Sequence, residues 1–306
     1  MRFAPHPVTL RQLQYVVAVA DHQSFRRAAT QCRVAQPSLS AQVAQAERAL
    51  GVRLFDRDKR RVELTAAGRV VVARARAVLE GADALVETAR TLGDPFSGTL
   101  RLGVIPTIAP YLLPEIVPRL RERHPKLAIA WAEEKTNVLA DRLQSSELDG
   151  AILALEADIG DLPHALIGYD PFVLAAAPNH PLVASTTPIA AAKLDGERVL
   201  LLDDGHCLRG QALSLCARVG AEEAGFRATS LSTLVQMAVN GDAFTLLPQI
   251  AVEVENRTNA LRVRSFAGKG PGRTIVLVWR KPSALESTLR AIAVICRAAY
   301  RAKFER

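Results

Sequence analysis

Apolar residues recur with the period of a helix in the first fifty residues of the chain. The spacing predicts a helix over 10–20, a second helix capped by Ser24 and a third helix that opens at Gln36, with Pro37 tolerated in its first turn. The apolar positions of the first and third helices are Leu10, Leu13, Val16, Val17 and Ala20, and Leu39, Val43, Ala46 and Leu50. A turn through 32–34 separates the last two helices, so the pattern predicts a helix-turn-helix unit.

The chain after Gly51 has two short extended runs around a charged turn, a pattern typical of a wing. From Ala66 to about Leu92 it contains no proline and predicts one long helix. This helix carries more apolar surface than an isolated helix leaves in water, so we expect a second copy of the chain to pack against it. The apolar residues concerned are Val70, Ala73, Ala77, Leu79, Ala84 and Leu85. A Gly-Asp-Pro-Phe-Ser-Gly segment over 93–98 ends the helix and marks a hinge.

Short apolar runs alternate with helical patterns beyond the hinge, which is typical of an α/β domain. The runs that we predict to be buried strands are 100–104, 127–131, 150–155, 199–202, 245–247 and 275–279. Ligands of such sheets bind at the carboxyl ends of the strands. Thr107 follows the first predicted strand and Cys207 follows a later one, so we expect both of them near the binding cleft.

Length and composition place the chain among globular proteins. Its 306 residues, 49% of them hydrophobic, are enough for two or three domains with buried cores. The N-terminus shows no apolar export region, and no uncharged apolar run is long enough to span a bilayer, so we expect a cytoplasmic protein without membrane contact. Four cysteines do not make a secreted disulfide framework, so we expect reduced thiols in a reducing compartment.

Positive charge is concentrated in the first third of the chain. Residues 1–92 contain 15 Lys and Arg against 8 Asp and Glu, whereas residues 93–306 contain 24 against 23. A basic module on a near-neutral body is typical of a DNA-binding protein, although a solvated basic surface gives the same count. We expect the third helix to meet the major groove through Gln36, Pro37, Ser38, Ser40 and Gln42. The wing should meet the DNA backbone or the minor groove through Arg57, Lys59, Arg60 and Arg61.

Two of the four cysteines lie in one short window. Cys207 stands between His206 and the nearby Arg209, and Cys216 follows nine residues after Cys207. An imidazolium or guanidinium beside a thiol stabilises the thiolate, the form that attacks peroxides and disulfides, so the pair predicts a redox switch. If one helix joined the two cysteines, their Cα atoms would lie roughly 13 Å apart. A disulfide needs about 4.4–6.8 Å, so oxidation would have to refold this segment.

Two other interpretations of these cysteines stay open. Both residues can be buried, inert thiols that happen to lie close in the sequence. His206, Cys207 and Cys216 can also be considered as metal ligands, but their spacing is not that of a structural zinc site and no fourth ligand is evident. We therefore expect neither a metal nor a cofactor.

The order of motifs in the first seventy residues resembles the DNA-binding domain of the LysR-type transcriptional regulators. The motifs are Ser-Phe-x-x-Ala-Ala, Gln-Pro-Ser-Leu-Ser, Glu-x-x-Leu-Gly and Leu-Phe-x-Arg before Leu-Thr-x-x-Gly, and they run from about Leu10 to Gly68. The resemblance implies a multidomain chain, with an all-α winged helix-turn-helix domain over 8–66, a linker and dimerisation helix over 67–92 and an α/β regulatory domain over 98–306. The regulatory domain would contain two Rossmann-like subdomains of the periplasmic-binding-protein type, about 98–169 with 276–306 and about 170–275.

The second half of the chain resembles the OxyR group of that family, whose members sense hydrogen peroxide. The resemblance rests on the Cys207 segment, on Cys216 and on three later motifs, Phe-Arg-Ala-Thr-Ser-Leu over 226–231, Leu-Leu-Pro over 246–248 and Arg-Thr-Ile over 273–275. It implies that Cys207 is the peroxidatic cysteine and Cys216 the resolving one. It also implies that peroxide is held by Thr107, Thr136, His206 and Cys207, with Arg273 as a candidate thiolate stabiliser. Gly210 stands where many members carry an aspartate, which puts any role of that carboxylate in doubt here.

Together these features predict a sequence-specific DNA-binding transcription regulator, not an enzyme, that is switched by reversible oxidation of Cys207 and controls oxidative-stress genes. The expected partners are double-stranded promoter DNA, hydrogen peroxide, further copies of the chain in a homodimer or a homotetramer of two dimers, thiol reductants, and RNA polymerase if the protein is an activator. One alternative is a LysR-type regulator whose cleft binds a metabolite while the cysteines take no part. Another is a thiol peroxidase, which would leave the basic winged helix without a purpose.

Overall fold

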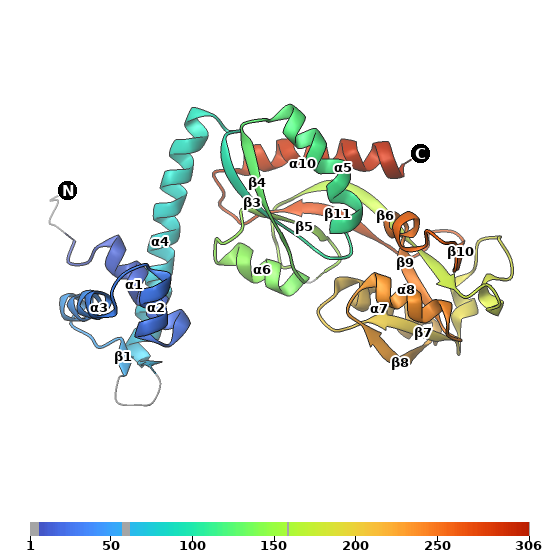
Figure 1. The fold of residues 1–306 in the computed structure, drawn as a ribbon, viewed down its shortest axis with the longest axis horizontal. Helices are drawn as coiled ribbons and strands as arrows, with labels where there is room; N and C mark the ends of the chain where they lie inside the picture. The colour runs from blue at the N-terminus through green and yellow to red at the C-terminus, as the bar shows by residue number, and fades with distance from the viewer. Residues whose placement is uncertain (1–5, 57–61, 158, 306) are drawn as a thin grey trace. The chain divides into compact units, whose positions relative to one another are not determined.

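The computed structural model describes residues 6–56, 62–157 and 159–305 of the chain. Its contacts divide the chain into two compact units, Met1–Ala89 and Arg90–Arg306 (Figure 1). Within the described ranges, every helix is too short or too polar to cross a lipid bilayer.

The first part of the N-terminal unit consists of α1 (Leu10–His22), α2 (Phe25–Gln31) and α3 (Gln36–Leu50). Ser24 caps α2 as predicted, because its hydroxyl oxygen accepts a hydrogen bond from the backbone N–H of Arg27. The core between the helices includes Val16, Val19, Ala28, Leu39, Val43 and Ala46. The helix-turn-helix prediction is confirmed, although Leu10 is 48% exposed and Val19, which the apolar pattern did not single out, is buried.

The wing and the start of the long helix follow α3. Gly51 ends α3 in the left-handed conformation, and strands β1 (Phe55–Asp56) and β2 (Glu63–Leu64) pair antiparallel, as expected for a wing. The predicted wing contacts Arg57, Lys59, Arg60 and Arg61 lie outside the described residues. A Cβ atom on Gly68 would lie 2.1 Å from the backbone oxygen of Leu54, so glycine is needed where the long helix passes the wing.

The long helix α4 covers Ala66–Gly93, which confirms the predicted helix. On one side Val72 packs into the core of the N-terminal unit, and Arg76 forms an ion pair with Asp21 of α1. Its exposed apolar residues are Val70, Ala73, Ala77, Val78, Leu85 and Val86. Leu79 is half-buried, and the side chain of Ala84 lies outside what the structure describes. Much of the apolar surface that the sequence analysis noted on this helix is therefore open to a partner.

The C-terminal unit is built on one continuous sheet with two halves. The strands of the first half are β3 (Gly98–Val104), β4 (Leu127–Glu133), β5 (Gly150–Ala154) and β11 (Gly272–Val278). β3 pairs in parallel with β4 and β5, and β11 runs antiparallel beside β5. The helices of this half are α5 (Ala109–Arg123), α6 (Thr136–Gln144) and α10 (Glu286–Phe304). α5 and α10 pack together on one face, and α6 covers the other (Figure 1).

The second half of the sheet carries the segment with the cysteine pair. Its strands are β7 (Arg198–Leu202), β8 (Glu222–Ala228), β9 (Phe244–Pro248) and β10 (Arg262–Ser265). β7 lies in the middle and pairs in parallel with both β8 and β9. The helices of this half are α7 (Cys207–Val219), α8 (Leu231–Val239) and α9 (Gln249–Glu255), and short 3₁₀ turns cover 181–183 and 191–194.

One long strand, β6 (His164–Ala176), belongs to both halves. Its first part pairs with β11, and its last part pairs with β9 and β10, all antiparallel. The path through the sheet is therefore β4-β3-β5-β11-β6-β9-β7-β8, with β10 beside β6. Two mostly parallel half-sheets joined by the shared strand β6 confirm the predicted α/β regulatory region of two subdomains.

All six predicted strands are present, but the sequence analysis missed β6, β8 and β10. Asp170 and Pro171 interrupt the apolar pattern of β6. A proline within an apolar run argues against predicting a strand from the sequence alone. β8 begins with Glu222 and Glu223 and lies at the edge of the sheet, so it lacks the apolar run of a buried strand. These strands form because their neighbours in the sheet supply the pairing.

Candidate redox site and DNA-binding surface

Cys207 is the first residue of α7, at the carboxyl end of β7. The chain leaves β7 through Asp203 and Asp204, turns at Gly205 in the left-handed region (φ 89°) and enters the helix at His206 in an extended conformation. The open first turn of a helix leaves backbone N–H groups without intrahelical partners and favours negative charge. The Cys207 thiol therefore lies at the open N-terminal turn of α7.

The two cysteines of the pair lie at opposite ends of α7. Cys207 is half-buried and packs against the main core of the unit, whereas Cys216 is 4% exposed in the smaller core of the second half-sheet. Burial raises the pKa of the Cys216 thiol, so this sulfur is protonated at neutral pH. Nine steps of one helix separate the Cα atoms by roughly 13 Å. Both thiols are free, and a disulfide between them requires the first turns of α7 to unwind.

An ion-pair network fixes the start of α7 to the sheet. The Arg209 guanidinium, 7% exposed, donates to both Glu223 oxygens at 2.8 and 3.1 Å, to Asp204 at 2.9 Å and to the backbone oxygen of Leu202 at 3.2 Å. Arg227 donates to the same two carboxylates at 2.9 and 3.3 Å. The sequence analysis expected a guanidinium to act on the thiolate, but carboxylates balance the charge of Arg209. Through these contacts Arg209 positions the loop before Cys207.

His206 is 8% exposed, and it is neutral at neutral pH. Burial lowers its pKa, the charge of Lys135 lowers it further, and the carboxylate of Asp203 opposes both. Its Nε2 atom lies 3.2 Å from Asp203 Oδ1 but has no hydrogen-bond partner within the described part of the chain. The expectation that an imidazolium would stabilise the thiolate therefore needs correction. A neutral ring offers one donor and one acceptor to a small polar ligand.

Lys135, which the sequence analysis missed, connects the two halves of the sheet at this site. It directly precedes α6 in the first half, and its Nζ atom donates to both Asp203 oxygens at 3.0 and 3.1 Å and to the Asp204 backbone oxygen at 2.8 Å. The sequence contains no signal for this pair, because the partners are 68 residues apart and lie on different half-sheets. The contacts bring the N-termini of α6 and α7 together.

Thr136 opens α6 next to Lys135 and is 8% exposed. Its hydroxyl has no hydrogen-bond partner within the described residues, which is rare for a buried polar atom. Thr136 Oγ1 and His206 Nε2, which belong to two residues predicted to bind peroxide, are thus buried without a hydrogen-bond partner in the described chain, on the two helix starts that Lys135 joins. Such atoms are commonly satisfied by an ordered water or a small polar ligand.

Thr107 and Arg273 form a second buried polar cluster. Arg273 donates to the Thr107 hydroxyl at 2.6 Å, to the Thr107 backbone oxygen at 2.7 Å and to Asp170 at 3.0 Å. Arg273 and Asp170 are neighbours across the β11–β6 ladder, and both are fully buried. Burial raises the pKa of Asp170, while the charge of Arg273 and the backbone N–H of Ile250 oppose that shift.

The structure shows hydrogen-bond partners of Arg273 that the sequence analysis did not predict. Its hydrogen bonds within the described chain go to Asp170 and Thr107, and its direct action on the Cys207 thiolate stays a prediction. Because the Thr107 hydroxyl oxygen accepts from Arg273, its proton is oriented away and is available to a ligand. Arg273 is therefore a positioning residue for Thr107.

The other two cysteines are structural in character. Cys296 is fully buried in α10, and burial raises its pKa to about 12. Cys32 follows α2 in the N-terminal unit, and burial raises its pKa as well. Both thiols are therefore protonated at neutral pH, and the thiolate is the form that attacks peroxide.

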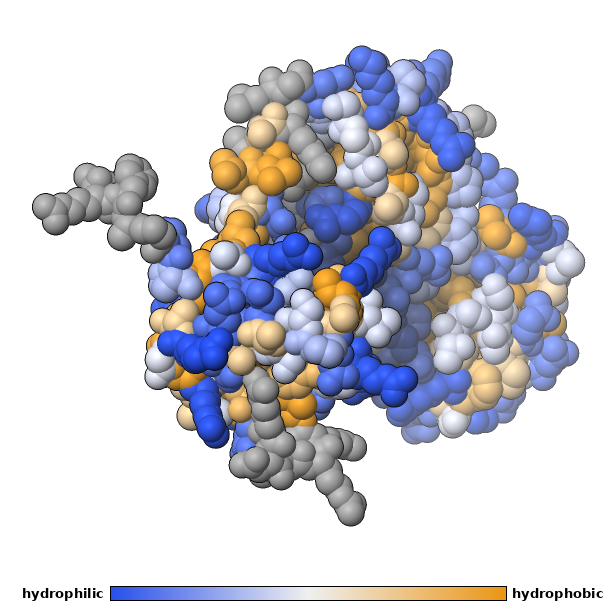
Figure 2. Space-filling model, turned by 60° about the vertical axis from the view of Figure 1, so that its left-hand side comes forward, coloured by the Kyte–Doolittle hydropathy of each residue, from blue (hydrophilic) through white to orange (hydrophobic). Residues whose placement is uncertain are grey.

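The predicted DNA-contact residues of α3 differ in exposure. Gln36, Pro37 and Ser38 are exposed, whereas Ser40 and Gln42 are half-buried. The Gln42 side-chain oxygen accepts a hydrogen bond from Gln12 at 3.1 Å, which leaves the NH2 group of Gln42 to reach a base edge. Figure 2 shows one face of the molecule on which hydrophilic side chains surround smaller apolar patches.

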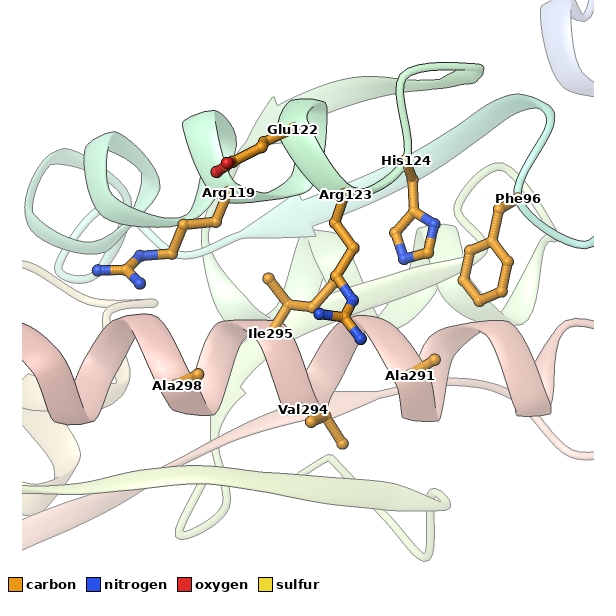
Figure 3. Close-up of a pocket in the computed structure, with 9 residues that line it drawn as sticks. All are labelled: Phe96, Arg119, Glu122, Arg123, His124, Ala291, Val294, Ile295 and Ala298. Carbon is orange, nitrogen blue, oxygen red and sulfur yellow. The ribbon is translucent and has the colours of Figure 1, made fainter.

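A groove lies between α5 and α10, apart from the cysteine pair, and has a volume of about 720 Å³. Phe96 stacks on His124 at one end, with the ring centres 3.9 Å apart. Figure 3 shows the side chains that line it, Phe96, Arg119, Glu122, Arg123 and His124 above Ala291, Val294, Ile295 and Ala298 of α10. The residues of the redox site do not line this groove.

Two family models match the chain. The bacterial regulatory helix-turn-helix protein model of the lysR family covers residues 10–69, and the LysR substrate binding domain model covers residues 93–301. The first contains α1–α3, the wing and the start of α4, and the second contains the whole two-part sheet.

Known proteins resemble the chain over nearly its full length. The DNA-binding transcriptional dual regulator OxyR of Escherichia coli (strain K12) is 41% identical over 300 residues, which cover 98% of each chain. A full-length OxyR variant from Pseudomonas aeruginosa is 33% identical, with 95% of both chains covered and a TM-score of 0.75. An OxyR variant from Corynebacterium glutamicum with hydrogen peroxide bound is 31% identical, with 99% of this chain and 94% of that chain covered and a TM-score of 0.66.

Proposed function

The chain belongs to the LysR family of bacterial transcriptional regulators, and we propose that it senses hydrogen peroxide through Cys207 and changes its contacts with promoter DNA in response. The observation that carries this proposal is the pair of buried, unpartnered polar atoms, Thr136 Oγ1 and His206 Nε2, at the helix starts beside Cys207. A site of small polar donors and acceptors around one thiol suits a ligand of two oxygen atoms. Because the His206 ring is neutral, one of its nitrogen atoms can donate a hydrogen bond and the other can accept one.

The chemistry follows from these groups. The Cys207 thiolate attacks one peroxide oxygen, the O–O bond breaks, and the sulfur becomes a sulfenic acid. The departing oxygen takes a proton and leaves as water, with Thr107, Thr136 and His206 as the groups that hold peroxide and support this transfer. The Cys216 thiol then attacks the sulfenic sulfur, a second water leaves, and a disulfide forms. Thiol reductants return the pair to two thiols.

Resolution by Cys216 couples the chemistry to the fold. The disulfide requires Cα atoms about 4.4–6.8 Å apart, so the first turns of α7 must unwind to let Cys207 reach Cys216. Unwinding pulls Arg209 away from Asp204 and Glu223 and changes the surface of the second half-sheet. A local sulfur–sulfur bond thereby becomes a rearrangement of the regulatory unit.

The N-terminal unit would bind the DNA, and the rearrangement would change its contacts there. We infer that α3 enters the major groove of double-stranded promoter DNA and that the wing contacts the backbone. The exposed apolar face of α4 is the surface on which a second copy packs, in a homodimer or a dimer of dimers in the cytoplasm. RNA polymerase is a further partner if the protein activates transcription. The protein consumes peroxide only as a signal, so it is a regulator rather than an enzyme.

A footprint of the protein on a palindromic promoter, with and without peroxide, tests the proposal. The wild-type footprint should change after peroxide and return after a thiol reductant. Cys207→Ser should bind the same DNA with an unchanging footprint, and Cys32→Ser, with a half-buried cysteine of the other unit, should respond like wild type. A Cys207→Ser protein that still responds would contradict peroxide sensing at Cys207 and would direct attention to a metabolite in the cleft.

A further inference from the structure

We propose that Lys135 is a positioning residue that stabilises the reduced form, and this proposal rests on the proposed function. Lys135 lies in the first half of the sheet and binds Asp203 and Asp204, which precede Cys207 in the second half. The latch consists of Lys135, Asp203 and Asp204. Removing it should favour the disulfide over the two thiols without any change at the sulfur atoms.

The contacts of the latch are numerous for a single side chain. The Lys135 ammonium group has three donors, and they meet Asp203 Oδ1 at 3.0 Å, Asp203 Oδ2 at 3.1 Å and the Asp204 backbone oxygen at 2.8 Å. The side chains of Lys135 and Asp203 are 34% and 31% exposed, so water screens the pair only in part. The lysine therefore fixes both backbone and side chain of the loop.

The stem of Lys135 also constrains the loop. A Cβ atom on Gly205 would lie 2.9 Å from Lys135 Cδ, and Gly205 already has a φ of +89° that side chains rarely adopt. The lysine thus covers the glycine directly before His206 and Cys207. A side chain at position 205 would therefore displace the lysine from the loop.

Asp203 links the latch to the predicted peroxide ligand. Its Oδ1 atom lies 3.0 Å from Lys135 Nζ and 3.2 Å from His206 Nε2. Burial lowers the pKa of His206, the lysine charge lowers it further, and Asp203 opposes both. The carboxylate of Asp203 therefore lies between the latch lysine and the ring of His206.

The latch opposes oxidation because disulfide formation must move its partners. Cys207 cannot reach Cys216 unless the first turns of α7 unwind, and Asp203 and Asp204 are attached directly to that end of the helix. The three hydrogen bonds of Lys135 therefore stabilise the reduced form only. For a partly screened pair, their loss should change the equilibrium about three- to tenfold.

A glutathione redox titration of the full-length protein tests the latch. In the reaction, glutathione disulfide accepts two electrons from the two protein thiols, which gives one protein disulfide and two reduced glutathione molecules. Lys135→Met should raise the equilibrium constant for disulfide formation about three- to tenfold, equivalent to a potential about 15 to 30 mV more reducing. Lys135→Arg should stay near wild type, because it retains charge and donors, and the exposed Lys193→Met should match wild type.

Asp203→Asn provides a second test that does not depend on the fold of the methionine variant. It weakens the same contacts from the other half of the sheet, so its equilibrium constant should rise in the same direction. If wild type forms a Cys207–Cys216 disulfide and both variants have the same equilibrium constant as wild type, the latch is wrong while peroxide sensing stands. If wild type forms no such disulfide at any glutathione ratio, the proposed switch and the latch both fail.

Discussion

Two kinds of buried polar side chain surround the start of α7. Arg209 and Arg273 have their hydrogen bonds filled by carboxylates and carbonyl oxygens, and they hold the backbone in place. Thr136 and His206 have buried polar atoms that stay unpartnered within the described residues. The first kind determines geometry, and the second kind is available to a ligand.

His206 makes the stability of the regulatory unit depend on pH. Folding lowers its pKa below 6.5, so the unfolded chain binds a proton more readily than the folded chain. The stability that depends on the neutral ring is fully present above pH 6.5 and is lost as the pH falls from there through the folded-state pKa. His206→Asn should remove this loss, so the gap in thermal midpoint between variant and wild type should shrink below pH 6.5.

The exposed His164 provides the control for this comparison. His164→Asn should follow the wild-type pH dependence, because that side chain is exposed on β6 and lies apart from His206 in the sequence. If the thermal midpoints of His206→Asn and wild type changed in parallel as the pH falls through 6.5, the fold would not be holding the His206 ring neutral.

Helix α7 is the element on which the switch depends. It contains Gly210, where a Cβ atom would meet no heavy atom within 4 Å. Glycine in a helix interior weakens the helix, so α7 is less stable than its length suggests. A glycine at this place thus makes the first turns easier to unwind.

Gly210→Ala should stabilise α7 by about 0.5–1 kcal/mol and shift the disulfide equilibrium about two- to fivefold towards the thiols. Glutathione titration with alkylation of free thiols measures this shift. Gly81→Ala in α4, another helical position with open space around the added Cβ, should leave the equilibrium unchanged. An unchanged titration for Gly210→Ala would mean that α7 keeps its first turns in the oxidised form.

The elements were predictable to the extent that local patterns define them. The three N-terminal helices, the wing strands, α4 and six strands follow from apolar spacing, caps and breakers. β6 could not be predicted, because Asp170 and Pro171 break its pattern and its pairing partners are distant in sequence. The pairs Lys135–Asp203 and Arg273–Asp170 were hidden for the same reason, since each joins residues 68 or 103 positions apart.

The whole molecule combines a basic DNA-binding unit with a redox-responsive unit, and α4 begins in the first of them. The exposed apolar residues of α4 include Leu85, at 71%, and Val70, at 65%. A monomer gains nothing from this surface, so its presence favours a symmetric dimer that reads two DNA half-sites.

Leu85→Glu should break this dimer, because it places a charge in the apolar contact. Analytical ultracentrifugation should then show a smaller assembly, and affinity for a two-half-site promoter should fall about a hundredfold or more as avidity is lost. Val294→Glu, with a side chain 68% exposed on α10, should keep the assembly. A Leu85→Glu protein that sediments like wild type would place the dimer contact elsewhere.

Peptide mapping by mass spectrometry after one equivalent of hydrogen peroxide tests the central claim most directly, with wild type and Cys216→Ser treated side by side. Wild type should lose two hydrogen atoms and yield a Cys207–Cys216 crosslinked peptide, with Cys32 and Cys296 unmodified. Cys216→Ser should stop at a Cys207 sulfenic acid, one oxygen heavier and trapped by a sulfenic-acid reagent. A wild-type protein whose Cys207 stays reduced while peroxide is consumed, or whose first oxidised residue is another cysteine, would contradict it.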